Sequence, residues 1–214
     1  MITSREILSL TLALIVLAFT NSFEKIILNK NFNLAFINSL LFFAIILIIY
    51  TFAKKFVAYY YEAEEETKIW TFQRYGLHEK NYFKNPVPIG IILPFILSIL
   101  SLGYIKWFAV TESEIKPLSI RAVKRHGIYS FSEMTEGHLA LISAAGIFSM
   151  FLLSILAYII NLPALAKLSI FFATFNLLPL GKLDGTKIFL GSRPLYLLIV
   201  LMDIIALSYA FFLP

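Results

Sequence analysis

Six long blocks of apolar residues, separated by shorter polar stretches, make up most of this sequence. They run over residues 7–19, 34–58, 87–110, 138–160, 163–180 and 194–212. Most of these blocks show neither the three- and four-residue spacing of an amphipathic helix nor the alternation of a half-buried strand. Long uninterrupted apolar runs are typical of helices that cross a bilayer, which need about 17–25 residues. The pattern predicts an all-α protein, a polytopic transmembrane helix bundle of about six spans.

The blocks differ in how clearly each predicts a span. Residues 7–19 are short, and a cleaved signal peptide is the alternative, although Glu6 interrupts the basic region that such a peptide needs. Three prolines, at residues 86, 88 and 94, lie just before or near the start of the third block, which predicts a kinked or late-starting helix. Only residues 161–162 separate the fourth block from the fifth, so these two should form a membrane hairpin.

The polar connections leave no room for a second domain. The longest cover residues 59–85 and 111–136, and we expect a single integral membrane domain over residues 1–214. The first connection contains the run Glu-Ala-Glu-Glu-Glu at residues 62–66. A charge run of this kind usually forms a solvated helical face, and we interpret it so.

Composition supports the membrane interpretation. Apolar residues make up 59% of the chain and charged residues 14%, and the mean hydropathy is +0.82, whereas a soluble domain needs more charge at its surface. The net charge is +5, and the basic residues lie mostly between the blocks, which fits anchoring at anionic lipid headgroups. No stacking or base-reading element indicates nucleic-acid binding. The absence of cysteine excludes disulfides and cysteine-based zinc sites.

Localisation follows in part from the same pattern. We expect a multi-pass integral membrane protein of the cell membrane. With six spans, eight basic residues fall on the N-terminal side and ten on the other. This division is too even for the positive-inside rule to orient the chain.

The sharpest candidate for chemistry lies at residues 176–185, which read Asn-Leu-Leu-Pro-Leu-Gly-Lys-Leu-Asp-Gly. Proline and glycine favour unwound backbone here, and at membrane depth such backbone is tolerated only inside protein or beside a water-filled cavity. An aspartate in that setting, Asp184, could bind a metal, relay protons or close an ion pair. The alternative, which these residues by themselves favour, is an interfacial turn with Asp184 in water.

The three histidines form no recognisable metal motif. His78, His126 and His138 are never three or four residues apart, as paired zinc ligands on a helix must be. His78 and His126 lie in polar connections, where solvated side chains are the simpler interpretation, and His138 opens the fourth block. No Ser–His–Asp signature, phosphate loop or dinucleotide fingerprint is present.

Two segments carry a family resemblance. Residues 175–187 resemble the C-terminal NxxPxxxLDG motif of the site-2 protease family, whose members are intramembrane zinc metalloproteases. Residues 144–150 (Ala-Ala-Gly-Ile-Phe-Ser-Met) are similar to the family's AGPxxN segment. With the predicted hairpin, the resemblance covers roughly residue 34 to the C-terminus and implies a site-2-protease-like core. It also implies the zinc-ligand position for Asp184 and substrate-cleft positions for the following residues: Asn176, Pro179, Asp184 and Gly185.

The sequence differs from this family at the positions of the zinc ligands and the general base. The family's other two zinc ligands and its general base come from HExxH, and the matching stretch here puts Tyr50 and Lys54 at the histidines and Thr51 at the glutamate. Ile147 and Met150 replace the proline and asparagine of AGPxxN. Zinc catalysis needs three protein ligands, an open water position and a base. A phenol, a hydroxyl and an ammonium do not supply them, so we expect a divergent member lacking HExxH, with no catalytic residue, metal or other cofactor.

We therefore expect a catalytically inactive homologue that binds transmembrane segments of other proteins or regulates a partner such as an active sibling protease. The alternative is an active intramembrane zinc metalloendopeptidase with atypical ligands, namely Asp184, His138 and His78. A small transporter or proton-coupled channel would need broken helices in both halves, and only one is present. General membrane scaffolding also remains open. The lipid bilayer is an expected partner and nucleic acid is not.

One geometric prediction tests the alignment with HExxH. If the resemblance holds, Asp184 faces the helix that carries Tyr50 and Lys54. A buried carboxylate has to be protonated, hydrated or paired. We predict that the Lys54 ammonium, or failing that the Tyr50 hydroxyl, lies within hydrogen-bonding reach of Asp184. Lys187, three residues further along, is the local competitor.

Overall fold

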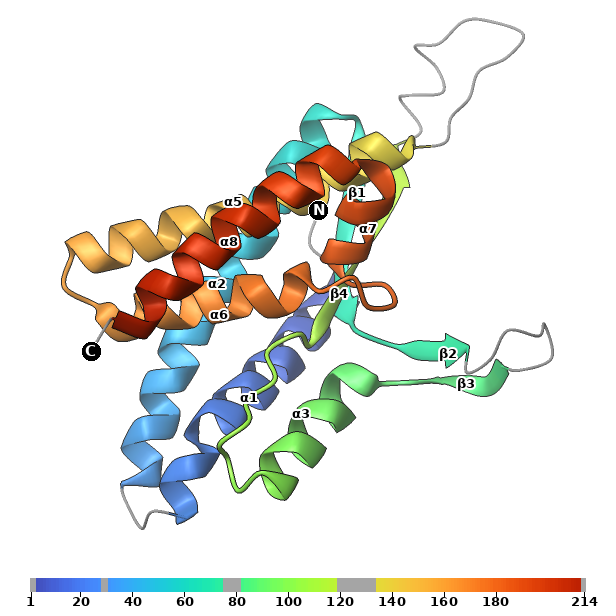
Figure 1. Ribbon diagram of the computed structural model, residues 1–214. Helices are drawn as coiled ribbons and strands as arrows, with labels where there is room; N and C mark the ends of the chain where they lie inside the picture. Colours follow the sequence, from blue (N-terminus) through green and yellow to red (C-terminus); the bar gives the residue numbers. More distant parts are fainter. Residues whose placement is uncertain (1–2, 28–30, 75–81, 119–133, 213–214) are drawn as a thin grey trace, which may run out of the picture.

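The computed structural model describes residues 3–27, 31–74, 82–118 and 134–212. Its helices are α1 (Ser4–Ile27), α2 (Phe32–Tyr60), α3 (Ile89–Leu100), α5 (Glu136–Ile159), α6 (Pro163–Leu177), α7 (Asp184–Gly191) and α8 (Arg193–Phe212). Its strands are β1 (Ala63–Ile69), β2 (Phe72–Arg74), β3 (Tyr82–Val87) and β4 (Thr111–Pro117). The described chain is therefore mainly helical, as predicted, with two small antiparallel sheets, β1–β4 and β2–β3, that the sequence interpretation did not include (Figure 1).

Four described helices, α1, α2, α5 and α8, are long and apolar enough to cross a membrane. Two further apolar helices coincide with predicted spans but are short, because α3 has 12 residues and α6 has 15. The membrane character of the chain is thus supported, and among the described residues four of the six predicted spans are helices long enough to cross a bilayer.

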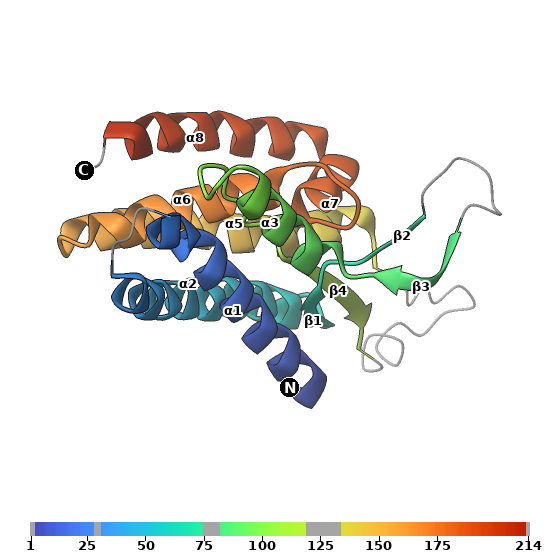
Figure 2. The ribbon, with the colours of Figure 1, turned by 90° about the horizontal axis from the view of Figure 1, so that it is seen from below.

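The long helices meet in one region beside the strands, and away from it α1 and α2 diverge from α5, α6 and α8 (Figure 1 and Figure 2). At one end, here called the strand end, lie β1, β4, α7 and the beginnings of α1, α5 and α8. At the other, the turn end, α1 gives way to α2 and the tight turn at residues 160–162 joins α5 to α6. This turn forms the predicted hairpin, and it contains Asn161 at a φ of 59°. The core between the helices contains large buried side chains such as Phe43, Ile147 and Phe172.

The third apolar block is not the single crossing that we predicted. Helix α3 begins only at Ile89, after Pro88, and ends in a turn where Gly103 packs against the backbone of Glu24 near the end of α1. The chain then returns without helix through Phe108, Ala109 and Val110, all of which are buried. Non-helical backbone at membrane depth has to be enclosed by protein, and these three residues of the return segment meet that condition, whereas Ile105 before them is exposed.

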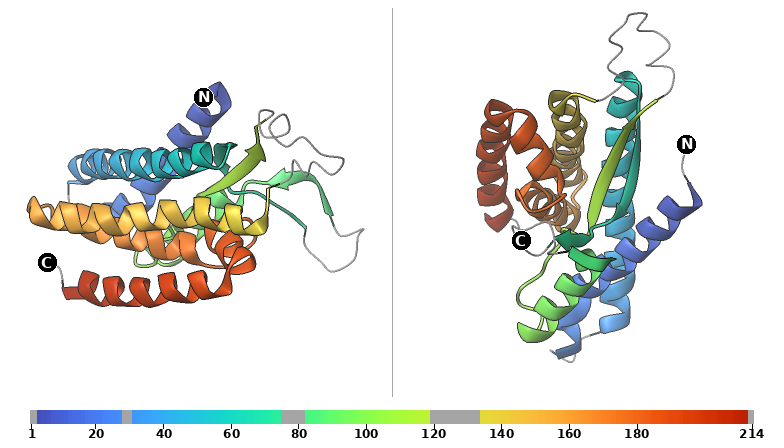
Figure 3. Two further views of the ribbon diagram at one scale, coloured as in Figure 1. Left: turned by 90° about the horizontal axis from the view of Figure 1, so that it is seen from above. Right: turned by 90° about the vertical axis from the view of Figure 1, so that its right-hand side faces the viewer.

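Pairing of β1 with β4 fixes the direction of this return. Seven residues of each strand are in register, from Ala63 opposite Pro117 to Ile69 opposite Thr111. Both ends of the third block therefore lie at the strand end, and the assignment of basic residues to two sides on the basis of six crossings was wrong. Figure 3 shows the strand pair beside α2.

The acidic run at residues 62–66 was also wrongly predicted. It lies mostly on strand β1 rather than on a helix, and Ala63, Glu65 and Thr67 are buried while Glu64 is exposed. Buried and more exposed positions alternate because successive side chains of a strand point to opposite faces. One glutamate of an apparently solvated run thereby enters the interior.

Candidate functional site

The chain unwinds between α6 and α7, as the proline and glycine residues predicted. Helix α6 ends at Leu177, and Gly181 adopts a φ of +57° in the connection. At Gly185 a Cβ atom would lie 1.9 Å from the carbonyl oxygen of Leu177, so only glycine fits there. This close approach folds the first turn of α7 against the end of α6 and carries Asp184 into the protein.

Asp184 lies in the interior and faces α2. Its Oδ2 accepts a hydrogen bond of 2.6 Å from the Tyr50 hydroxyl and lies 3.1 Å from Lys54 Nζ. The side chains of Asp184 and Lys54 are 3% and 1% exposed, which makes this a buried ion pair. Lys187 Nζ approaches the other carboxylate oxygen at 3.0 Å. The predicted contact with α2 is thus confirmed, and the local competitor is present as well.

Two serines complete the surroundings of this carboxylate. Ser113 on β4 donates to Oδ1 over 3.1 Å and accepts from Lys54 Nζ over 2.5 Å. Ser143 on α5 lies 3.3 Å from Oδ1. Four elements distant in sequence, α2, β4, α5 and α7, therefore meet at one carboxylate, with a donor directed at it from each.

The segments that resemble family motifs meet here too. Gly146 of the AGPxxN-like stretch packs so closely on α2 that a Cβ would lie 2.8 Å from the Tyr50 ring and 3.0 Å from Lys54. Thr51, which the resemblance aligns with the family's glutamate, instead donates to the carbonyl of Leu47 over 2.7 Å on its own helix. It therefore takes no part in the polar contacts around Asp184.

The ion pair continues into a larger cluster that we call the buried ion network. It consists of three carboxylates and three ammonium groups: Glu6, Glu65, Asp184, Lys54, Lys55 and Lys187. Lys54 lies 3.6 Å from Glu65, and Lys55 lies 3.6 Å from Glu65 and 2.7 Å from Glu6. Because the charges are equal in number, the network buries charge without a net excess of either sign, which limits the cost of removing it from water.

Charge pairing outweighs burial at Asp184. Burial by itself would raise the pKa of this carboxyl, but the ammonium groups of Lys187 and Lys54 and the hydrogen bond from Tyr50 hold the pKa below its usual value. Asp184 is consequently a charged carboxylate at neutral pH.

The residues around Asp184 do not fit a zinc ion. A divalent cation would share the carboxylate with two ammonium groups that already lie within 3.1 Å of it, and the other neighbours are hydroxyls. Zinc prefers histidine, cysteine and carboxylate ligands. Within the described ranges, no group of three such side chains is placed to hold a metal.

Of the histidines proposed as alternative ligands, the structure describes only His138, which does not join Asp184 in such a group. His138 lies at the start of α5, where its Nδ1 is 2.8 Å from the Thr135 hydroxyl and its ring packs on Tyr61. His78 and His126 lie outside the described residues.

The other predicted cleft residues have local structural contacts. Asn176 is buried, and its side-chain amide donates to the carbonyl of Phe172 over 2.8 Å. Pro179 lies exposed in the connection between α6 and α7. A substrate-cleft role for Asn176, Pro179 and Gly185 therefore stays a prediction.

Sequence reasoning missed several residues of the site. Ser113 and Glu65 reach it only because β1 pairs with β4, a non-local contact with no signal in either segment alone. Glu6, an acid beside an apolar block, could have been recognised, since an ionisable group near membrane depth needs a partner. Asp203, in the middle of the last block, could have been recognised by the same argument.

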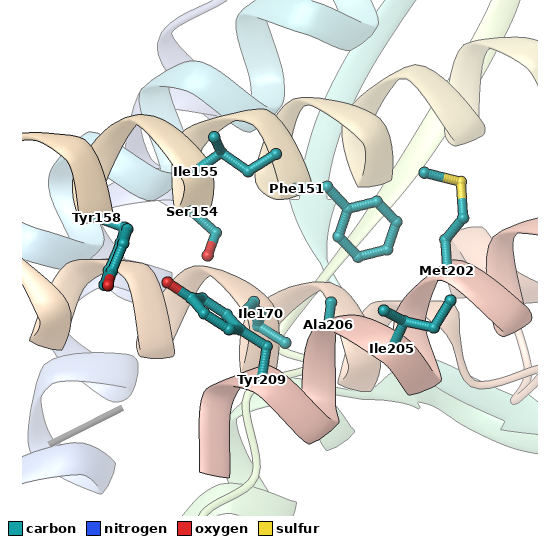
Figure 4. Close-up of a pocket in the computed structure, with 9 residues that line it drawn as sticks. All are labelled: Phe151, Ser154, Ile155, Tyr158, Ile170, Met202, Ile205, Ala206 and Tyr209. Atoms are coloured by element: carbon teal, nitrogen blue, oxygen red, sulfur yellow. The ribbon is translucent and has the colours of Figure 1, made fainter. Parts of the chain in front are cut away.

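Asp203 lies on α8, next in sequence to Met202, which lines an apolar groove between α5, α6 and α8. Its Oδ1 accepts a hydrogen bond of 3.0 Å from Thr174 on α6. The groove has a volume of about 390 Å³ and is lined by Phe151, Ser154, Ile155, Tyr158, Ile170, Met202, Ile205, Ala206 and Tyr209 (Figure 4). We call it the α5–α8 groove. Apart from hydroxyl groups its wall is apolar, as expected for a surface that faces lipid or another membrane helix.

No family model, no curated protein and no solved structure matches this chain. The resemblance to the site-2 protease family therefore rests on the residues of the motif-like segments and on where the fold places them.

Proposed function

We propose that this chain is a non-catalytic relative of the site-2 proteases, a pseudoprotease that binds transmembrane segments of other proteins. The observation that carries the proposal is the contact of Tyr50 and Lys54 with Asp184. On the family resemblance, these are the positions of two histidine ligands and of the aspartate ligand. They meet in space as metal ligands would, but a hydroxyl and an ammonium now neutralise and solvate the carboxylate.

This arrangement offers no route to metal-dependent hydrolysis. An ammonium at 3.1 Å from Asp184 repels a divalent cation, and Thr51 supplies no carboxylate to accept a proton from a metal-bound water. The chemistry of the donor set thus argues against proteolysis by the mechanism of the family.

The contact between Ser113 and Lys54 also resembles a nucleophile and base, because serine–lysine pairs perform hydrolysis in some enzymes. A lysine that acts as a base has to be neutral. Lys54 instead lies 3.1 Å from Asp184 and 3.6 Å from Glu65, so its amine is engaged in ion pairs with two carboxylates. The Ser113 hydroxyl donates to Asp184 Oδ1 rather than to Lys54, and we therefore assign the contact to structure.

The α5–α8 groove supports the binding part of the proposal. Small and hydroxyl-bearing residues such as Ser154 and Ala206 let another helix approach closely in a membrane, and tyrosine hydroxyls can hydrogen-bond across such an interface. The groove opens between two helices that are long enough to span the bilayer. A transmembrane helix is therefore the occupant that we propose.

A cleavage assay tests the absence of proteolysis. Purified protein is reconstituted in liposomes with zinc and a reporter containing a membrane segment, beside the Asp184→Asn variant. We expect wild type and Asp184→Asn to give the same background level of reporter cleavage. Cleavage that requires Asp184 and is blocked by a chelator would contradict the proposal.

Site-specific crosslinking tests the groove. A photoreactive residue is placed at Ile205, which lines the groove, or at Ile48, which is similarly exposed on α2 outside it. We expect Ile205 to crosslink to membrane segments of other proteins and Ile48 not to do so. Equal protein crosslinking from both positions, or crosslinking to lipid alone, would remove the support for a binding groove.

A further inference from the structure

Asp203 is an ionisable residue in the middle of α8, a helix that is long and apolar enough to cross a membrane. Its side chain is largely buried, because the residue is only 5% exposed. Among the described residues, no basic side chain lies within salt-bridge distance of the carboxyl group, and Thr174 alone donates a hydrogen bond to it. An acidic residue at this depth is costly and is normally paired with another polar group, so its position indicates a function.

The contact with Thr174 satisfies Asp203 incompletely. The Thr174 hydroxyl lies 3.0 Å from Asp203 Oδ1 and also 3.0 Å from the backbone carbonyl oxygen of Ile170 on its own helix. A hydroxyl has a single proton and donates to one acceptor at a time. The other carboxylate oxygen, Oδ2, accepts no hydrogen bond from the described residues. Asp184, by contrast, has two ammonium groups within 3.1 Å. The carboxyl group of Asp203 can therefore accept a donor from outside the chain.

Asp203 is adjacent to the α5–α8 groove. Its neighbour in sequence, Met202, lines the groove, and so does Ala206, three residues further along α8. On α6, the groove-lining residue Ile170 is four residues from Thr174. Because a helix rises about 1.5 Å per residue, Asp203 lies about 4.5 Å along the helix axis from Ala206. The hydrogen-bonded pair of Asp203 and Thr174 is thus about one helical turn from the groove, on two of the helices that form its wall.

The two ends of the groove differ in chemistry. Figure 4 shows Met202 at one end and Tyr158 and Tyr209 at the other. Asp203 therefore belongs to the Met202 end. Met202 is 39% exposed, and its unbranched side chain adapts readily to a neighbouring group. A lysine of a bound helix has a four-carbon stem, which can follow this apolar wall while the ammonium reaches the carboxylate.

We propose that Asp203 selects the transmembrane segment that binds in the α5–α8 groove, by pairing with a basic side chain in the middle of that segment. This inference rests on the proposed binding function and specifies the chemistry of its partner. Opposite charges inside a membrane pair with one another, because either charge alone is unfavourable in hydrocarbon. A groove that recognised only an apolar helix would need no carboxyl group beside it.

Synthetic transmembrane peptides test this selectivity. The protein, with a photoreactive residue at Ile205 in the groove, is reconstituted in phosphatidylcholine vesicles. Leucine–alanine helices of about 20 residues are added, with either lysine or methionine at the central position. The dependence of crosslinking on peptide concentration gives the affinity at the groove. We expect the lysine peptide to bind about tenfold more tightly than the methionine peptide, and Asp203→Asn to abolish this preference.

The matched control is Glu24→Gln, which removes a carboxylate of α1 outside the groove and should keep the preference for lysine. Thermal unfolding establishes that each variant is folded. If Asp203→Asn is not, a peptide with a central aspartate is compared on wild type, and it should bind no more tightly than the methionine peptide.

Three results would overturn the inference. They are equal binding of the lysine and methionine peptides to wild type, a preference for lysine that persists in Asp203→Asn, and an aspartate peptide that binds as tightly as the lysine peptide. All three leave the groove as a binding site for membrane helices. Failure of every peptide to crosslink at Ile205 would instead contradict both this inference and the proposed function.

Discussion

At the scale of single residues, Lys54 determines the character of the candidate site. Its ammonium lies 3.1 Å from Asp184, 3.6 Å from Glu65 and 2.5 Å from the Ser113 hydroxyl, and its side chain is 1% exposed. Replacing a whole buried ion pair by apolar groups is often tolerated, whereas removing one partner leaves an uncompensated charge in the interior. The energetic importance of Lys54 therefore lies in what its loss would leave behind.

Lys54→Met should destabilise the protein by about 3–5 kcal/mol, because it leaves Asp184 and Glu65 with fewer counter-charges in the interior. Lys187→Met should cost less, since this lysine is 18% exposed and water can replace part of its contact with Asp184. Lys182→Met, at a side chain 64% exposed, serves as the control. Reversible unfolding in detergent measures all three, and a Lys54 variant as stable as the Lys182 variant would refute the assigned role.

Asp184 should also produce a pH dependence of stability. Its pKa in the folded protein lies below the unfolded value of about 3.9. Its contribution is therefore complete above that value and is lost as the pH falls through the folded pKa. The difference in unfolding free energy between wild type and Asp184→Asn should shrink as the pH is lowered from about 5 to 3. A difference that stays constant over this range would mean that the pKa of Asp184 is not lowered in the fold.

The contact between Lys54 and Asp184 could be predicted from the sequence, because two motif-like segments implied a shared site. Ser113 and Ser143 could not, since neither belongs to a recognisable motif and both reach Asp184 through tertiary packing. Asp203 was missed although it stands in an apolar block, which is itself a signal for a functional or paired carboxylate.

At the scale of elements, β1 and α3 differ most from the sequence prediction. The inward positions of β1 include Glu65 and Thr67 rather than apolar residues, so hydrophobic alternation gave no strand signal. The ammonium groups of Lys54 and Lys55 on α2 stabilise the Glu65 carboxylate in the interior. We predicted a single span for the third block because the turn at residues 101–104 does not interrupt its hydrophobicity. At this turn the helix ends and an extended segment returns.

Glu65→Gln tests whether β1 is held by charge. We expect a loss of about 1–3 kcal/mol in unfolding free energy, because Glu65 lies within 3.6 Å of both Lys54 and Lys55 and accepts a hydrogen bond from Thr67. Glu64→Gln, on the exposed face of the same strand, should change stability by less than about 0.5 kcal/mol. Equal losses in the two variants would show that the strand is not oriented as described.

At the scale of the whole molecule, the return of the third block redistributes the basic residues. Among the described residues, those at the turn end are Lys25, Lys106 and Lys167. Those at the strand end are Arg5, Lys54, Lys55, Lys68, Arg74, Lys84, Lys116, Lys182, Lys187 and Arg193. The fold therefore places most of the basic residues at the strand end, whereas the assignment from the sequence divided them almost equally between the two sides. The positive-inside rule then predicts that the strand end faces the cytoplasm.

Cysteine labelling checks this orientation, since the natural sequence contains no cysteine. A single cysteine is introduced at Lys182, exposed at the strand end, or at Ala164, exposed at the turn end. An impermeant maleimide applied to intact cells should label Ala164→Cys and spare Lys182→Cys until the membrane is opened. The reverse pattern would invert the predicted topology.

The most direct test of the account is the zinc content of the purified protein. The central claim is that Lys54 and Lys187, rather than a divalent cation, neutralise Asp184. Elemental analysis after incubation with zinc and removal of unbound metal should find the same small, substoichiometric amount in wild type and Asp184→Asn. Stoichiometric zinc in wild type that disappears in Asp184→Asn would contradict the claim, because the carboxylate would then be a metal ligand.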